Sequence, residues 1–324
     1  MSAEGGNKAV VAALLANTGI ALTKFIAYLI THSASMLAES IHSLADAGNQ
    51  VLLLVGAKRS KREATEEHPF GFGRERYIYA FIVSIVLFTV GGLYALYEAV
   101  HKINELRAGH EPEGNFRWIS LVVLAIAMVM ESFSFRTAIV ESNKVRGSKG
   151  WVPFVRGAKA PELPVILLED LAALIGLIIA FVGVSLTLLT GNEYFDVVGA
   201  GVIGVLLIVV AITLAIEVKS LLIGESATKE AIDRIKAAIL GTEGVENVIH
   251  MKTLHIAPEE LLVAVKIGVQ GTALGSDVAA MIDAVERNLR AAEPMATQIF
   301  IEPDIYRADY VAEPRPEAPS APSH

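Results

Sequence analysis

Four polar residues interrupt an apolar stretch near the start of the chain at spacings of three, four and three positions: Glu39, His42, Asp46 and Asn49. A helix with this spacing carries all four side chains on one face. His42 and Asp46, which are one turn apart, can bind one cation together. An imidazole nitrogen with carboxylate oxygens suits Zn²⁺ and, less selectively, Mn²⁺, Co²⁺, Ni²⁺ or Fe²⁺.

A second acidic pair, Glu169 and Asp170, lies in a later apolar segment. Neighbours on a helix diverge by about 100°, so one of the two is expected to point inward. Asp46 lies 12 residues before a basic cluster and Asp170 lies 11 residues after another. At the helical rise both carboxylates would lie about 16–18 Å deep, near the middle of a bilayer. The alternative is structural: His42 can bond to Asp46 within its helix, and Asp170 can bond to nearby backbone.

Other charges in apolar segments have less defined roles. Glu39 lies four residues from the predicted outer end of its helix, which indicates an interfacial or exit-vestibule residue. Glu131 lies 13 residues into another helix, where it can be a further ligand, a proton carrier or a partner of Lys24. Charged groups inside a membrane are costly, so each is a functional candidate.

The elements that must position these residues are membrane helices. Apolar residues make up 53% of the 324 positions and charged residues only 19%. A bilayer core requires about 20 helical residues, and soluble helices rarely lack a polar face for so long. The sequence predicts a transport domain over residues 1–223 with six transmembrane helices at about 9–31, 35–57, 77–100, 118–140, 162–190 and 195–218.

Charge is distributed unevenly along the chain. Residues 1–223 carry a net charge of −1 and residues 224–324 a net charge of −7. Lys and Arg gather in loops 58–76 and 144–159, so the positive-inside rule predicts cytoplasmic termini. Residues 1–8 show no cleavable signal peptide, and a bacterial inner membrane is expected. The acidic balance argues against nucleic acid as a partner, and the absence of cysteine excludes thiolate chemistry.

The C-terminal third has the pattern of a small α+β domain. Helical periodicity at 229–240 and 278–292 and strand patterns at 245–255, 261–269 and 297–301 predict the order αββαβ over residues 224–305. Such a short domain buries little core by itself, which favours pairing with a second copy. The Pro-rich residues 306–324 are expected to be disordered.

Several strings resemble the cation diffusion facilitator family, in particular the branch that contains mitochondrial zinc transporter-like proteins. They are SASMLAESIHSLADAGNQVLLLVGAKRS at 33–60, HPFGFGRERY at 68–77 and LLEDLAALIG at 167–176. The resemblance implies six membrane helices, a ferredoxin-like cytoplasmic domain and a homodimer in the lipid bilayer. It also implies export of divalent metal, Zn²⁺ foremost, in exchange for protons, and no enzymatic activity.

The resemblance also implies a central metal site. His42 and Asp46 occupy the family's ligand pair on the second helix, and Asp170 matches the last position of the pair on the fifth. The first position of that second pair is Ile166, which has no donor atom. A fourth ligand is expected from Glu169, Glu131 or water.

Two further metal sites are implied more weakly. His68 matches a loop position that binds metal in some members, although Pro69 and nearby glycines can stabilise the loop without metal. His250, Glu302 and Asp304 match positions of a cytoplasmic site, but Lys266 stands where another histidine can occur. The alternative is that the two carboxylates end the last strand in solvent.

Two other functions compete with transport. A metal-sensing or scaffold membrane protein that no longer transports is suggested by Ile166, because a missing ligand can abolish turnover. An intramembrane hydrolase is suggested by Asp46 and Asp170 at one depth, although no protease motif accompanies them.

Overall fold

The structure of the chain, a computed structural model, describes residues 2–31, 34–108 and 117–307. The side chains of 2–5, 31, 34–39, 41, 42 and 117 lie outside this description, as does the predicted tail from residue 308 on. The chain forms two compact units. The first comprises residues 1–225 with 255–259, and the second comprises 226–254 with the rest of the chain from 260 on.

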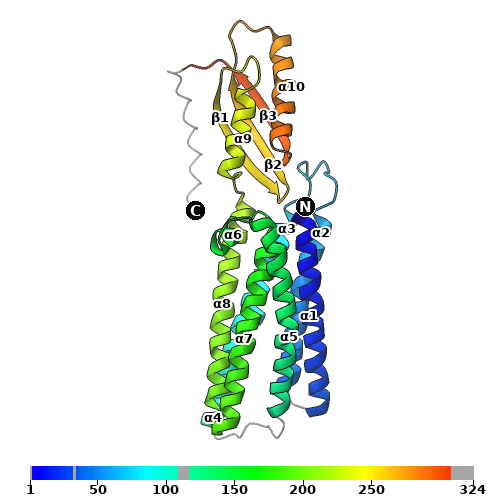
Figure 1. Cartoon of the computed structure of the whole chain (residues 1–324), viewed down its shortest axis with the longest axis vertical. Coiled ribbons are helices and arrows are strands. Elements are labelled where there is room, and N and C mark those ends of the chain that lie inside the picture. Colours follow the sequence, from blue (N-terminus) through cyan, green and yellow to red (C-terminus); the bar gives the residue numbers. More distant parts are fainter. Residues whose placement is uncertain (1, 32–33, 109–116, 308–324) are drawn as a thin grey trace, which may run out of the picture. The chain divides into compact units, whose positions relative to one another are not determined.

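The first unit is a bundle of long helices (Figure 1). In chain order they are α1 Ser2–Thr31, α2 Ala34–Arg59, α3 Glu75–Val86, the π-helical η1 Leu87–Leu93, α4 Tyr94–Arg107, α5 Arg117–Arg146, the short α6 Trp151–Gly157, α7 Glu162–Thr190 and α8 Tyr194–Ile223. The segments α3, η1 and α4 form one continuous span. Among the described residues, five helices are long and apolar enough to cross a membrane. The protein is therefore a multi-pass membrane protein.

Helix α2, with 26 residues, completes the bundle by packing against α1 and α3. It falls outside the five apolar spans because polar residues such as Ser43, Asn49 and Gln50 lie along it, and these three are buried. A polar helix is stable in this position because its neighbours, rather than lipid, surround the polar face. The predicted helical membrane fold is confirmed.

Around α2, helix α1 also packs against α5, α5 against α7, and α7 against α8 (Figure 1). Helix α8 lies close to the α3–η1–α4 span at two glycines. A Cβ atom on Gly92 would lie 2.5 Å from Ile208 Cγ1, and one on Gly204 would lie 2.9 Å from Leu96 Cγ. Small residues let membrane helices approach this closely, and van der Waals packing then holds them together.

The second unit has the predicted αββαβ order. It contains α9 Lys229–Leu240, β1 Asn247–Ala257, β2 Glu260–Gly268, α10 Gly275–Ala292 and β3 Ala296–Asp304. The sheet order is β1-β2-β3, and β2 runs parallel to β3 with Val263 opposite Ile299. Apolar residues of both helices and β2 share one core, including Ile235, Val263 and Val285. The predicted α+β fold class of this domain is confirmed.

Candidate metal centre

A cavity of about 210 Å³ lies inside the helical unit. Five carboxylates line it, among them Asp46 from α2, Glu131 from α5 and Glu169 from α7. The cavity has room for a cation with several waters. Acidic side chains within a membrane bundle face such cavities because lipid cannot solvate them. The geometry therefore suits a cation bound within the membrane.

Basic and acidic groups extend the polar lining of this cavity. Lys24 of α1 is buried and lines it together with the carboxylates. Glu98 and Lys102 of α4 also line it, and they pair with each other at 3.3 Å. Asp196, in the first turn of α8, completes this set. The polar lining therefore extends to α1, α4 and α8.

Glu169 is held by amide groups of α2. Asn49 Nδ2 donates to Glu169 Oε1 at 3.0 Å, and Gln50 Nε2 donates to Glu169 Oε2 at 3.0 Å. Asn17 of α1 donates from Nδ2 to Gln50 Oε1 at 3.3 Å. Asn49 lies on the predicted polar face of α2, whereas residue spacing predicted no role for Gln50 or Asn17. Their only sequence signal is an amide side chain beside apolar residues in a predicted membrane helix.

Asp170 is turned toward α5 instead. Ser134 Oγ donates to Asp170 Oδ2 at 2.7 Å. Both members of the acidic pair are thus buried, with Glu169 bonded to α2 and Asp170 to α5.

The remaining central residues divide between the described and undescribed parts. His42 and Glu39 lie on α2, but their side chains lie outside the described residues. Ile166 is fully buried in the apolar core of α7, one turn before Glu169. In the part of the chain that the structure describes, no three His, Asp or Glu side chains converge closely enough to hold a metal ion.

The loop histidine lies at the surface. His68 is exposed, and its ring centroid lies 4.7 Å from that of Phe72. The Arg62 guanidinium lies over the same Phe72 ring at 4.2 Å. Stacking of this kind stabilises a loop without metal.

The candidate cytoplasmic residues are arranged around a lysine. Lys266 Nζ lies 2.8 Å from Glu302 Oε1 and 3.1 Å from Asp304 Oδ2. His250 is exposed on β1. The ammonium group pairs with both carboxylates and offsets one of their two negative charges, so a cation bound there would have to displace it.

We expect Lys266→Met to change how this cluster titrates. Hydrogen bonds to Glu302 and Asp304 raise the pKa of Lys266, and the bond from Lys266 lowers the pKa of Asp304. The stability from Asp304 is present at neutral pH and lost as pH falls through its lowered pKa. The stability from Lys266 is lost as pH rises through its raised pKa.

In the Lys266→Met variant the pKa of Asp304 is expected to rise toward its ordinary value. Carbon NMR of the Asp304 carboxyl group in the full chain measures this, with Lys252→Met as the control. An unchanged Asp304 titration would contradict the prediction.

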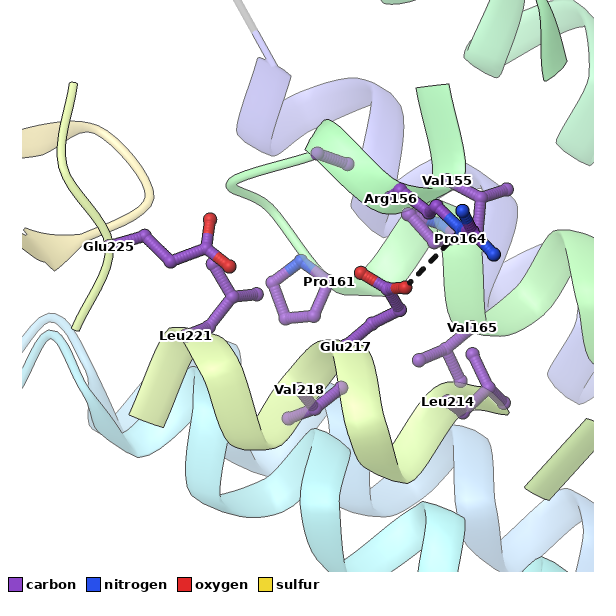
Figure 2. A pocket seen from close by; sticks show the side chains of 11 residues that line it. Val155, Arg156, Pro161, Pro164, Val165, Leu214, Glu217, Val218, Leu221 and Glu225 are labelled. Carbon is purple, nitrogen blue, oxygen red and sulfur yellow. Dashed lines mark ion pairs between the residues drawn. The ribbon is translucent and has the colours of Figure 1, made fainter. Parts of the chain in front are cut away.

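A second crevice lies where α6, the start of α7 and the end of α8 meet (Figure 2). Its lining is mostly apolar, with Arg156 facing Glu217 at 3.9 Å. Glu225 also lines it and is paired with Lys159. The crevice volume is about 10 Å³, space for about one water molecule. It is too small to hold a hydrated cation.

The fold defines a multi-pass membrane protein, and the cavity inside its helical unit is lined by acidic side chains. The chain belongs to the cation efflux family. The model of the cation efflux transmembrane domain matches residues 10–223, and that of the cation efflux protein cytoplasmic domain matches residues 227–306. This family consists of transporters rather than enzymes, which confirms both the resemblance and the expectation of no enzymatic activity.

Proteins whose names refer to metal transport or metal tolerance match most of the chain. The human proton-coupled zinc antiporter SLC30A9, mitochondrial, is 33% identical over 78% of the chain and 43% of its own length. Metal tolerance protein C4 of Arabidopsis thaliana is 27% identical over 78% of the chain and 54% of its own length. The manganese efflux system protein MneP of Bacillus subtilis is 26% identical over 74% of the chain and 76% of its own length. The chain thus spans less than half the length of the SLC30A9 protein.

Proposed function

We propose that the chain is a secondary transporter that exports divalent metal cations from the cytoplasm in exchange for protons. The observation that carries this proposal is the membrane cavity lined by Asp46, Glu131 and Glu169. The names of the relatives support Zn²⁺ as the foremost substrate and Mn²⁺ as a second. Because the proposed ligands are mostly carboxylate oxygens, Fe²⁺, Co²⁺ and Ni²⁺ are further candidate substrates.

The chemistry of the proposed ligands explains how metal and protons are exchanged. The proposed ligands are His42, Asp46 and Asp170, with Glu169 or Glu131 as the fourth. Imidazole and carboxylate groups bind metal only when they are deprotonated, so metal binding and proton binding compete. Metal loads from a near-neutral cytoplasm, and protons arriving from the other side displace it.

The proposed setting follows from charge and family. The Lys- and Arg-rich loops favour cytoplasmic termini in a bacterial inner membrane. The match of residues 227–306 to the family's cytoplasmic domain, together with the small core, supports a homodimer. We propose a transport domain over 1–223, a cytoplasmic domain over 224–305 and a disordered tail.

Purified full-length protein in sealed liposomes tests the function directly. An outward proton gradient, acidic inside, is expected to drive Zn²⁺ uptake, and a protonophore is expected to abolish the driven part. Valinomycin with balanced K⁺ holds the membrane potential at zero, and protein-free liposomes report leakage. Zn²⁺ uptake that is absent, or that ignores the proton gradient, would contradict proton-coupled export.

A further inference from the structure

Amide side chains hold Glu169 in place at the wall of the cavity. Both of its oxygens accept an amide hydrogen from α2, one from Asn49 and one from Gln50. Gln50 is completely buried and is itself held by Asn17 of α1. Three helices thus combine to fix one carboxylate, which is only 5% exposed.

The amides contact Glu169 from behind. Glu169 lines the cavity, whereas Asn49 and Gln50 are not among the residues that line it. A carboxylate oxygen has two lone pairs, so an oxygen that accepts one amide hydrogen can still bind a cation. Two donors also fix the plane of the carboxylate and offset the cost of burying its charge. The arrangement therefore presents a fixed carboxylate edge to the cavity.

The position one turn before Glu169 on α7 offers no metal ligand. Ile166 lies three residues before Glu169 and therefore on nearly the same face of α7, but it is fully buried and has no donor atom. Asn49 Oδ1 is buried without a hydrogen-bond partner in the described part of the chain. A purely structural network normally satisfies such an oxygen. The hydrogen bond from its NH₂ group to Glu169 is therefore what orients the Asn49 side chain.

We propose that Asn17, Gln50 and Asn49 are positioning residues that hold Glu169 as a ligand of the transported cation, and that they thereby favour Zn²⁺ over Mn²⁺. This inference rests on the proposed function. A carboxylate fixed in one orientation suits the short bonds and four-coordinate geometry of Zn²⁺. A released carboxylate can rotate and provide both oxygens, which suits a harder cation of higher coordination number.

The test compares Zn²⁺ and Mn²⁺ transport in Asn49→Leu, a variant of similar shape without the amide. We expect the KM for Zn²⁺ to rise about tenfold, the cost of about one hydrogen bond to a charged group. The KM for Mn²⁺ is expected to rise less, with maximal rates nearly unchanged. The matched control is Thr187→Val, a near-isosteric change of a buried polar residue on the same helix as Glu169.

A double variant that exchanges the amide and the carboxylate distinguishes positioning of the Glu169 carboxylate from simple packing. In Asn49→Asp combined with Glu169→Gln, the hydrogen bond is kept but the charge moves to α2. We expect this double variant to regain the melting temperature of wild type without regaining its KM for Zn²⁺. Full recovery of Zn²⁺ transport would overturn the proposal. Equal loss of maximal rate for both metals in Asn49→Leu, with both KM values unchanged, would also overturn it.

A binding measurement keeps the inference distinct from transport. If wild type moves no metal, the proposed function fails, and Zn²⁺ affinity is then measured by calorimetry on the full chain in detergent. Weaker Zn²⁺ binding by Asn49→Leu than by Thr187→Val supports positioning of Glu169. Equal affinities in the two variants overturn it.

Discussion

Replacing Asp46 by asparagine is expected to reduce proton-driven Zn²⁺ uptake about 100-fold or more. The change keeps the shape of the side chain but removes its negative charge. Asp46 lines the same cavity as Glu131 and Glu169, where a cation would be removed from bulk water. Loss of groups that merely orient metal ligands costs about 10–100-fold, so loss of a ligand should cost at least the upper end of that range.

Initial rates of Zn²⁺ uptake in proteoliposomes measure this effect, with protein content and melting temperature matched to wild type. Asp233→Asn is the control, because it makes the same chemical change on an exposed position of α9. If Asp46→Asn takes up Zn²⁺ at the wild-type rate, at both saturating and limiting Zn²⁺, then Asp46 is not a ligand of the transported metal. The proposed location of the transport site would then be wrong.

Arg76→Leu is expected to destabilise the folded protein by about 3–5 kcal/mol, since removing one partner of a buried ion pair leaves the other uncompensated. Arg76 Nε lies 2.5 Å from Glu162 Oε1, and its second nitrogen, Nη2, lies 2.9 Å from Glu162 Oε2. Arg76 is 8% exposed and Glu162 only 3%. This pair joins the start of α3 to the start of α7, the helix that carries Glu169 and Asp170.

Thermal unfolding of the full chain in detergent measures the loss. The double variant Arg76→Leu with Glu162→Leu is expected to recover most of the stability, because no uncompensated buried charge remains. Glu259→Gln serves as the control: Glu259 also contacts Arg76, at 2.6 Å, but it is 40% exposed, so its loss should cost little. Equal melting temperatures for wild type and Arg76→Leu would show that the pair contributes nothing.

Much of the fold follows from local pattern. Charge-free runs such as Leu171–Thr190 predict a membrane helix, and the alternation in Leu261–Val269 predicts a strand. The contacts of the site do not follow in this way. Gln50 and Glu169 are 119 residues apart, and the bond between them depends on how α2 packs beside α7. Ser134 likewise reaches Asp170 only after α5 has packed against α7.

Residue spacing also could not predict which helix each of the two acidic side chains contacts. Spacing shows that Glu169 and Asp170 point about 100° apart, but it leaves open which helix each one meets. The Glu169 amide contacts and the Asp170 hydroxyl contact depend on side-chain length and on neighbours from other helices. A metal site between helices is therefore predictable in composition and approximate depth, but not in detailed partners.

The π-helical stretch Leu87–Leu93 bears on how the third span can tolerate insertions and deletions. A π turn closes its hydrogen bonds over five residues instead of four, so it holds one residue more than an α turn. Each residue of an α-helix accounts for about 100° of rotation, and Glu98 and Lys102 line the cavity beyond this stretch. Deleting one residue within this stretch would convert the π turn into an α turn and leave both charged side chains on nearly the same face of the span, whereas a deletion in the α-helical part would turn them by about 100°. The third span can therefore lose a residue at Leu87–Leu93 without changing which side chains reach the cavity.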